Sequence, residues 1–295
     1  YRERKLLGRS LVSRVLKAVN NDFENTVFSY IPNTAETAFY GLMEGLRDFR
    51  IKNLKDAIQA NKSESEIERL LTLHPRIEKL MTKDAKLRTF ITADADREEL
   101  VSQVYDTTYG IISSNDTLVV LDDSIVRGTT LRKSILRILD RLKMKKIIVV
   151  SSAPQIRYPD CYGIDMSKMG DFVAFEAAVS LVLESKDGES LLNSIYDSAK
   201  INLEKNERES VNEVKRLFSA LTADAITERI GKILTPKDIS AEVEIIFQSI
   251  EGLHTACPHH KGDWYFTGNY PTYGGNRVAN RAFINYMESR NERAY

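Results

Sequence analysis

Short apolar runs of strand length recur along the chain and alternate with longer stretches of helical periodicity. Each run is rich in β-branched residues and has the length of a buried strand; the runs are 26–31, 87–91, 117–121 and 146–150. Between the last two, apolar residues recur at helical spacing from Leu131 to Leu142. Residues 117–150 therefore predict a strand, a loop, a helix and a second strand, which is the unit from which parallel sheets are built.

Other stretches predict helices and, at the end of the chain, irregular structure. Residues 1–19 and 65–80 place apolar side chains on one face, and residues 190–250 are mostly helical by pattern. The segment that begins "CPHHKGDWYFTGNYPT" is rich in glycine, proline and aromatic residues. We therefore expect a main domain over 1–185 with a helical insertion at 47–86, a helical region over 186–252, and an irregular segment over 253–295 that packs back on the domain.

Charge and composition exclude several classes of protein. The 295 residues contain 42 Lys and Arg and 42 Asp and Glu, so no basic excess indicates a nucleic-acid partner. No apolar run reaches the roughly 18 residues of a membrane span. The two cysteines, Cys161 and Cys257, give no disulfide framework, which favours a cytoplasmic protein.

The string "DDSIVRGTT" carries the strongest chemical signal. Asp122 and Asp123 directly follow a predicted strand, and residues 127–130 lead into the following helix. Ligands of open parallel sheets bind outside the carboxyl ends of the strands, and the backbone N–H groups of a helix N-terminus favour a phosphate. Gly128 permits close backbone approach, and the threonine hydroxyls add donors. Two carboxylates beside such a cradle suit a sugar phosphate; a turn that only caps the helix is the alternative.

The order of strand, "DDSIVRGTT" and helix resembles the phosphoribosylpyrophosphate (PRPP) signature of type I phosphoribosyltransferases. Together with "SSAPQIRYPDCYGIDM" (151–166), it resembles the glutamine PRPP amidotransferase family, the amidophosphoribosyltransferases. The strings "YRERKLLGRSL", "YIPNTAETA", "LRTFI" and "FTGNYPT" are weaker matches. The resemblance implies an α/β, parallel-sheet type I phosphoribosyltransferase fold with extra helical insertions and an irregular C-terminal segment.

The resemblance also implies a reaction and its residues. PRPP and ammonia would give 5-phosphoribosylamine and pyrophosphate, the first step of purine nucleotide synthesis. Asp122 and Asp123 would be catalytic and hold the ribose hydroxyls, directly or through Mg²⁺. The 5′-phosphate would contact Arg127, Gly128, Thr129 and Thr130, and the pyrophosphate would face Pro32, Asn33, Thr34 and Ala35. Further substrate or nucleotide contacts are expected from Arg88, Ser124, Arg157 and Tyr158; packing roles for the last two, and an exposed strand end for Arg88, remain open.

Several positions depart from the family pattern. Ala35 stands where the family commonly has serine, "TKDAK" (82–86) replaces a basic loop, and residues 102–110 contain no Lys or Arg. Fewer cations near a pyrophosphate weaken its electrostatic stabilisation. A non-catalytic PRPP- or purine-nucleotide-binding regulatory module is therefore the alternative function, and an assembly role for the long helices is a third.

The family also sets expectations about partners and cofactors. Ammonia would come from a glutaminase domain that this chain lacks, so glutaminase activity is not expected. Purine nucleotides are expected inhibitors, and a homo-oligomer is expected. Gly262 and Tyr265 stand where some members have cysteines, so no iron–sulfur cluster is expected. Cys257 with His259 and His260 matches no common zinc spacing, and a polar surface turn is the preferred interpretation.

Overall fold

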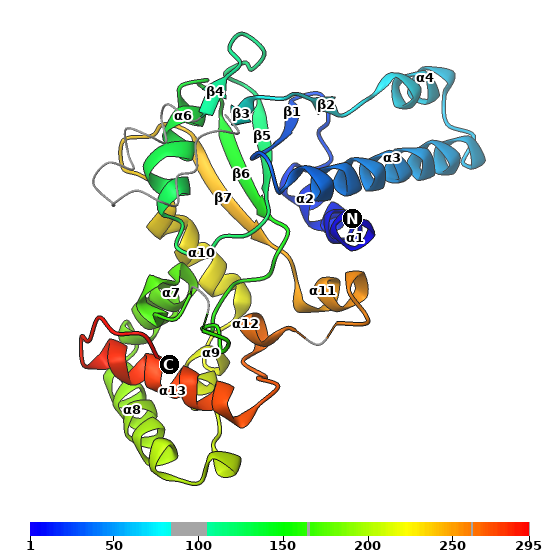
Figure 1. Ribbon diagram of the computed structural model, residues 1–295. Coiled ribbons are helices and arrows are strands. Elements are labelled where there is room, and N and C mark those ends of the chain that lie inside the picture. The colour runs from blue at the N-terminus through cyan, green and yellow to red at the C-terminus, as the bar shows by residue number, and fades with distance from the viewer. Residues whose placement is uncertain (84–104, 164–165, 261, 295) are drawn as a thin grey trace. The chain divides into compact units, whose positions relative to one another are not determined.

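The structure is a computed structural model, which describes residues 1–83, 105–163, 166–260 and 262–294 (Figure 1). The chain forms two compact units. The sheet unit contains residues 1–124, 129–153 and 235–257, and the helical unit contains residues 125–128, 154–234 and 258–295.

A five-stranded sheet forms the centre of the sheet unit, with strand order β2-β1-β5-β6-β7 and every neighbouring pair parallel. The strands are β1 (Thr26–Tyr30), β2 (Arg76–Ile77), β5 (Thr117–Asp122), β6 (Lys146–Ser151) and β7 (Glu242–Phe247). The Leu-, Val- and Ile-rich sequences of β5 and β6 are typical of parallel strands buried on both faces. A separate antiparallel pair joins β3 (Met81–Lys83) to β4 (Tyr105–Thr107).

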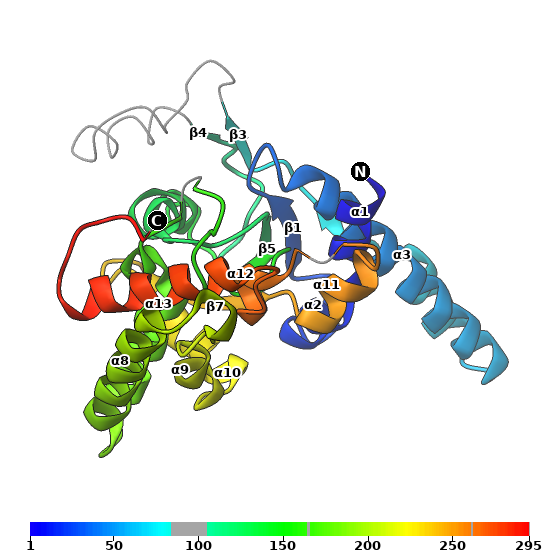
Figure 2. The same cartoon turned by 60° about the horizontal axis from the view of Figure 1, so that its bottom comes forward.

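Helices cover the two faces of this sheet. The connection from β1 to β2 contains α3 (Glu36–Gln59) and α4 (Glu64–Thr72). The connection from β5 to β6 contains η1 (Leu131–Ile135) and α6 (Leu136–Asp140). In the strand order these two connections run in opposite directions across the sheet. Because parallel crossovers are right-handed, opposite directions place these helices on opposite faces. The core beneath α3 also includes residues of α2 (Val12–Ala18) and Leu11, which directly follows α1 (Arg2–Ser10). Figure 2 shows where α1, α2 and α3 lie in the sheet unit.

Small residues let α1 and α3 pack with their backbones in contact. A Cβ atom added at Gly8 would lie 1.7 Å from the carbonyl oxygen of Ala38, and one at Gly41 would lie 1.9 Å from that of Lys5. Ion pairs between Lys5 and Glu44 and between Arg9 and Asp48 flank this contact. The first half of α3 is therefore fixed on the sheet unit.

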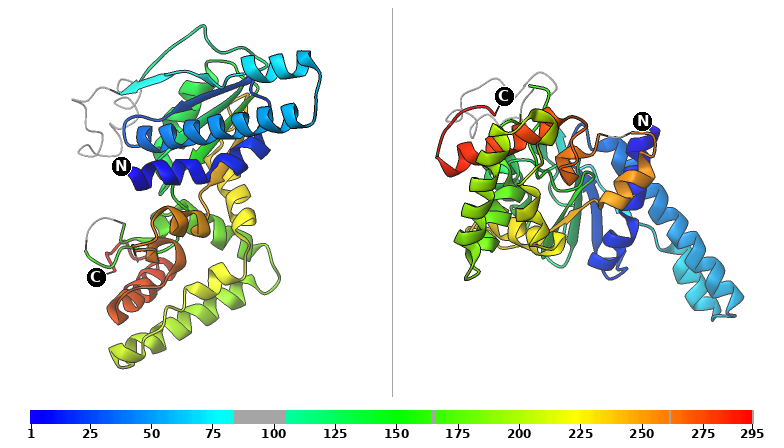
Figure 3. Two further views of the ribbon diagram at one scale, coloured as in Figure 1. Left: turned by 90° about the vertical axis from the view of Figure 1, so that its right-hand side faces the viewer. Right: turned by 90° about the horizontal axis from the view of Figure 1, so that it is seen from below.

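The helical unit is built around pairs of packed helices (Figure 3). Contacts join α7 to α10 and α8 to α13, and Phe175 meets the rings of Phe283 and Tyr286 edge-on. The elements are η2 (Met169–Asp171), α7 (Val173–Leu183), α8 (Gly188–Glu204), η3 (Glu207–Glu209), α9 (Lys215–Ser219), α10 (Ala223–Leu234), α12 (Trp264–Thr267) and α13 (Tyr273–Met287). Among the described residues, no helix is both long and apolar enough to span a membrane.

The parallel α/β fold predicted from the sequence is confirmed, with two corrections to its elements. Residues 242–247, expected within a helical region, form β7; a segment of six residues, four of them apolar, is too short to distinguish strand from helix by its pattern. Residues 273–287, expected to be irregular, form α13, although Gly274 and Gly275 disfavour a helix. The predicted run 87–91 lies outside the described residues, and the domain boundaries stay a prediction.

An ion pair stabilises the sheet at the amino-terminal ends of its strands. The guanidinium of Arg76, in β2, donates to both carboxylate oxygens of Asp116 at 2.6 and 3.2 Å and to the carbonyls of Glu24 and Ile111 at 3.2 Å. Asp116 is 2% exposed. Burial alone would raise the pKa of this carboxyl, but the hydrogen bonds from Arg76 and Ser113 bring the pKa below its ordinary value.

We expect Asp116→Asn to lower the free energy of unfolding by about 2 kcal/mol, because it leaves the Arg76 charge without its carboxylate. The folded pKa of Asp116 lies below the unfolded value of about 3.9. The contribution of the ion pair is therefore complete above that value and lost as the pH falls through the folded pKa. Urea unfolding from pH 6 to 3 should show the gap between wild type and variant narrowing as the pH falls. A constant gap would contradict a charge-based role.

Candidate functional site

The register of the parallel strands collects the candidate residues of the sheet unit at one edge. Tyr30 lies opposite Leu121, and Asp122 lies opposite Ser151. Beyond the strands, the N–H of Ile31 donates to the Leu121 carbonyl at 2.8 Å and that of Ser152 to the Asp122 carbonyl at 2.9 Å. The turn 31–35, the aspartate pair and the residues after β6 are thus neighbours at the carboxyl edge, where open α/β sheets bind ligands.

Backbone hydrogen bonds hold the aspartate pair. Asp122 Oδ1 accepts the N–H of Asp123 at 2.8 Å, and Asp123 Oδ1 accepts the N–H of Ser124 at 3.0 Å. The hydroxyl of buried Ser152 donates to the Asp123 carbonyl at 3.1 Å. Both aspartates and Ser124 are half-buried. The pair is therefore oriented by its own loop and remains accessible to a ligand. The sequence pattern alone did not indicate Ser152, which lies 29 residues further along the chain.

The turn that follows β1 presents different residues to solvent and to the core. Pro32 is buried, Asn33 and Thr34 are exposed, and the Pro32–Asn33 peptide is cis. Ala35 is 1% exposed and belongs to the apolar core beneath α3. The position at which the resembled family commonly has serine is thus occupied by a methyl group of the core.

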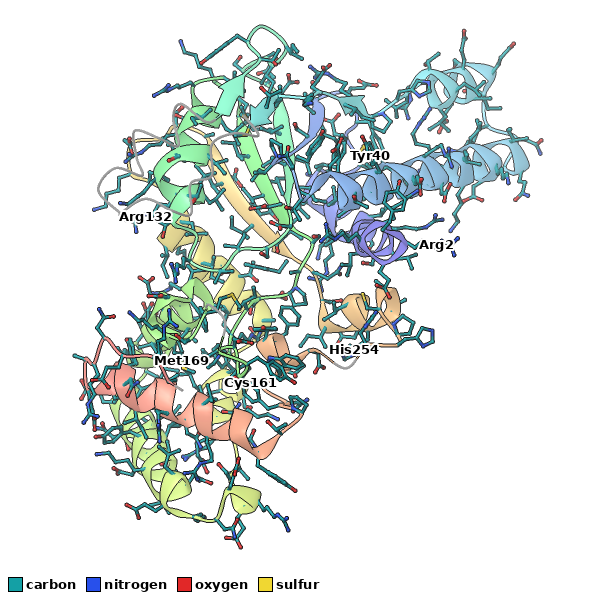
Figure 4. The ribbon with its side chains drawn as sticks, in the orientation of Figure 1. Arg2, Tyr40, Arg132, Cys161, Met169 and His254 are labelled. Atoms are coloured by element: carbon teal, nitrogen blue, oxygen red, sulfur yellow. The ribbon has the colours of Figure 1, made fainter. Side chains whose placement is uncertain are left out.

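A carboxylate and two tyrosines lie directly beside this turn. Glu36, the first residue of α3, accepts hydrogen bonds from the hydroxyls of Tyr30 at 3.0 Å and Tyr40 at 2.7 Å; Tyr40 is labelled in Figure 4. These bonds lower the pKa of Glu36, and the charge of Lys79 acts in the same direction. Burial, aided by Glu36, raises the pKa of Tyr30 to about 12. This cluster was not predicted from the sequence; the spacing of four between Glu36 and Tyr40 on one helix was the available signal.

The loop 125–128 belongs to the helical unit. Ile125 is buried, and the carbonyl of Val126 accepts the N–H of Val173 at 2.9 Å. Gly128 has a φ of 67°, and a Cβ atom there would lie 2.3 Å from a methyl carbon of Leu234. Packing thus explains this glycine without a ligand. Arg127 forms an ion pair with Asp171 at 2.9 Å. The next residues along the chain, Thr129 and Thr130, are exposed and begin the helix that continues into η1.

The other predicted contacts have different positions. Tyr158 is buried in the helical unit with its ring against Phe218, and the guanidinium of Arg157 donates to Gln155 and lies 5.3 Å from the same ring. These contacts favour a packing role for both residues. Arg88, like Lys86, lies outside the described residues.

The cysteines and histidines do not form a metal cluster within the described part of the chain, where no group of three or more His, Cys, Asp or Glu is arranged to hold a metal ion. Cys161 lies in the helical unit and His254 in α11 (Ile250–Ala256) of the sheet unit; Figure 4 labels both. Burial raises the pKa of the Cys161 and Cys257 thiols.

Comparisons with known proteins relate this chain to one family. No family model matches it. The amidophosphoribosyltransferase of Haemophilus influenzae is 42% identical over 67 residues, 23% of this chain and 13% of that protein. The corresponding protein of Escherichia coli is 33% identical over 87 residues, 28% of this chain and 17% of that protein.

A solved structure extends the relation from a segment to the fold. The glutamine PRPP amidotransferase of B. subtilis, complexed with ADP and GMP, covers 92% of this chain with a TM-score of 0.50 and 22% sequence identity. This chain spans 42% of the length of that protein. The chain is therefore homologous to the phosphoribosyltransferase region of the amidophosphoribosyltransferases.

Proposed function

We propose that this chain binds PRPP at the carboxyl edge of its sheet and transfers the phosphoribosyl group to ammonia, releasing pyrophosphate and forming 5-phosphoribosylamine. The observation that carries this proposal is the parallel register, which sets Asp122 and Asp123 beside the turn 31–35. Residues 127–130 follow directly along the chain and are proposed to contact the 5′-phosphate. Homology to the phosphoribosyltransferase region supports the same reaction class.

Electrostatics gives the aspartate pair its proposed role. Displacement at C1 of the ribose builds oxocarbenium-like positive charge, which nearby carboxylates stabilise. The same oxygens accept hydrogen bonds from the vicinal ribose hydroxyls. Ammonia is already a nucleophile, so its position and the exclusion of water matter more than a strong base. The hydrogen bonds that Asp122 and Asp123 accept within their loop keep the carboxylates in place before substrate arrives.

The residues at this edge also fit Mg²⁺. Magnesium is usually bound by one or two carboxylates together with substrate phosphates, and Asp122 and Asp123 offer half-buried carboxylate oxygens. When bound, the ion would neutralise charge on the departing pyrophosphate. Lys79 adds a cation near Glu36. Ammonia from another domain, inhibition by purine nucleotides and a cytoplasmic location belong to the same proposal.

A non-catalytic PRPP- or nucleotide-binding module is the second candidate. Two observations favour it: Ala35 turns a methyl group into the core, and the Arg127 guanidinium pairs with Asp171. A turn that lacks a hydroxyl at position 35 offers one oxygen fewer to a metal–pyrophosphate complex. Binding without turnover is the result that would distinguish this function from catalysis.

We expect Asp123→Asn to lower kcat/KM for PRPP by about 10²-fold or more, because a neutral amide does not stabilise developing positive charge. The side-chain oxygen of asparagine can still accept the Ser124 N–H, so the melting temperature should stay unchanged. Pyrophosphate release from Mg²⁺-PRPP and ammonium chloride in mildly alkaline buffer measures the effect. Asp197→Asn, on the exposed side of α8, is the matched control. Unchanged turnover would remove Asp123 from the mechanism.

Asp171→Asn should tighten PRPP binding by up to about fivefold, because an exposed ion pair contributes at most about 1 kcal/mol and the variant removes the carboxylate charge that pairs with Arg127. Titration calorimetry of both proteins with Mg²⁺-PRPP measures the change. Asp224→Asn makes the same substitution at another exposed position of the helical unit. Equal or weaker binding by Asp171→Asn would contradict a phosphate contact from Arg127.

A further inference from the structure

The carboxylate of Glu36, beside the turn 31–35, has one oxygen fixed and one oxygen open. Oε1 accepts the hydroxyls of both Tyr30, at 3.0 Å, and Tyr40, at 2.7 Å. Within the described part of the chain, no other hydrogen bond and no ion pair engages this carboxylate. Two donors on one oxygen fix the direction of the carboxylate, so that Oε2 keeps its lone pairs for a ligand.

The hydrogen bond from Tyr30 to Glu36 spans the whole turn, because Tyr30 ends β1 and Glu36 begins α3. The ring of Tyr30 also packs against that of Phe39, with the ring centroids 5.1 Å apart. Burial, aided by Glu36, raises the pKa of Tyr30 to about 12, so its hydroxyl remains a donor at neutral pH. The carboxylate therefore has a defined position relative to the backbone of the turn.

Glu36 gives this corner of the carboxyl edge a negative charge. The hydrogen bonds from Tyr40 and Tyr30 lower the pKa of Glu36, and the charge of Lys79 acts in the same direction. The group is therefore ionised at neutral pH. Glu36 and Tyr30 are half-buried, and Tyr40, labelled in Figure 4, is exposed. A ligand from solvent can thus reach the carboxylate.

A negative charge at this place opposes the binding of pyrophosphate, which is itself an anion. A divalent cation between the two groups changes repulsion into attraction, and magnesium is usually held by one or two carboxylates together with phosphates of the substrate. Ala35 contributes only a methyl group, which packs in the core. The next residue, Glu36, offers an oriented oxygen directly beside the same turn.

We propose that Oε2 of Glu36 is a ligand of the divalent cation that accompanies the pyrophosphate group of PRPP. Tyr30 and Tyr40 are then positioning residues, because they act on the cation only through Glu36. This contact is additional to the aspartate pair, which is proposed to hold the ribose. The role of Glu36 rests on the proposed binding of PRPP at this edge and does not require turnover.

Titration calorimetry with inorganic pyrophosphate and excess Mg²⁺ tests this role on the full chain. Glu36→Gln should weaken the binding of Mg²⁺-pyrophosphate at least about tenfold, because an amide group replaces the open oxygen. Glutamine keeps one oxygen for the tyrosine hydroxyls, so the melting temperature should match wild type. Tyr40→Phe should cause a smaller loss, since Tyr30 still orients the carboxylate. Glu64→Gln, at the exposed first residue of α4, is the matched control and should bind like wild type.

A change of metal separates ligation from a structural role. Imidazole suits Zn²⁺, whereas carboxylate suits Mg²⁺. Glu36→His should therefore raise the ratio of Zn²⁺-pyrophosphate affinity to Mg²⁺-pyrophosphate affinity at least about tenfold over the ratio of wild type. A carboxylate that only fastens the turn to α3 leaves this ratio unchanged.

The direction of each effect assigns a failure to its cause. Equal or tighter binding of Mg²⁺-pyrophosphate by Glu36→Gln would overturn the role of Glu36, because removing a charge that touches no metal relieves repulsion. An unchanged metal ratio in Glu36→His would overturn it as well. Failure of wild type to bind Mg²⁺-pyrophosphate would also overturn it, and a parallel titration with Mg²⁺-PRPP decides whether the proposed function fails at the same time.

Discussion

The hydrogen-bond register of β1, β5, β6 and β7 is the constraint on which the rest of the sheet unit depends. Four consecutive residues of β5 are essentially inaccessible to solvent: Leu118, Val119, Val120 and Leu121. The side chains on both faces of β5 are therefore buried. A sheet of this kind has no face left for polar chemistry. Polar groups can then gather only where the strands end, and the parallel direction brings several carboxyl ends to the same edge. The amino-terminal edge is fastened by the ion pair between Arg76 and Asp116.

The carboxyl edge combines features of a catalytic site with features of a simple binding site. The aspartate pair is held by the backbone of its own loop, as preorganised electrostatic stabilisation requires. Beside it, the methyl group of Ala35 packs in the apolar core. The carboxylate of Glu36 accepts hydrogen bonds from the hydroxyls of Tyr30 and Tyr40. A fixed negative charge next to a turn proposed to face pyrophosphate increases the need for a cation there. Magnesium and Lys79 are two proposed sources of positive charge beside this turn.

Helix α3 has two different environments along one continuous length. Its first half is clamped against α1 at Gly8 and Gly41, where backbone approaches backbone. Its second half and α4 bury almost nothing within the sheet unit. A crossover from β1 to β2 needs far less chain than these two helices provide. The extra length therefore lies outside the core of the sheet unit.

The sequence by itself determined the elements whose side chains carry a local signal. The β-branched runs 117–121 and 146–150, with the helical spacing between them, predicted a β-α-β unit. The string "DDSIVRGTT" predicted a ligand site after the first strand of that unit. Tertiary structure decided what local pattern leaves open. Residues 242–247 became the edge strand β7 through pairing with β6, and residues 273–287 became a helix through packing on α8. Likewise Ser152 joined the candidate site through the register of β5 and β6, because contacts between residues distant in sequence have no local signature.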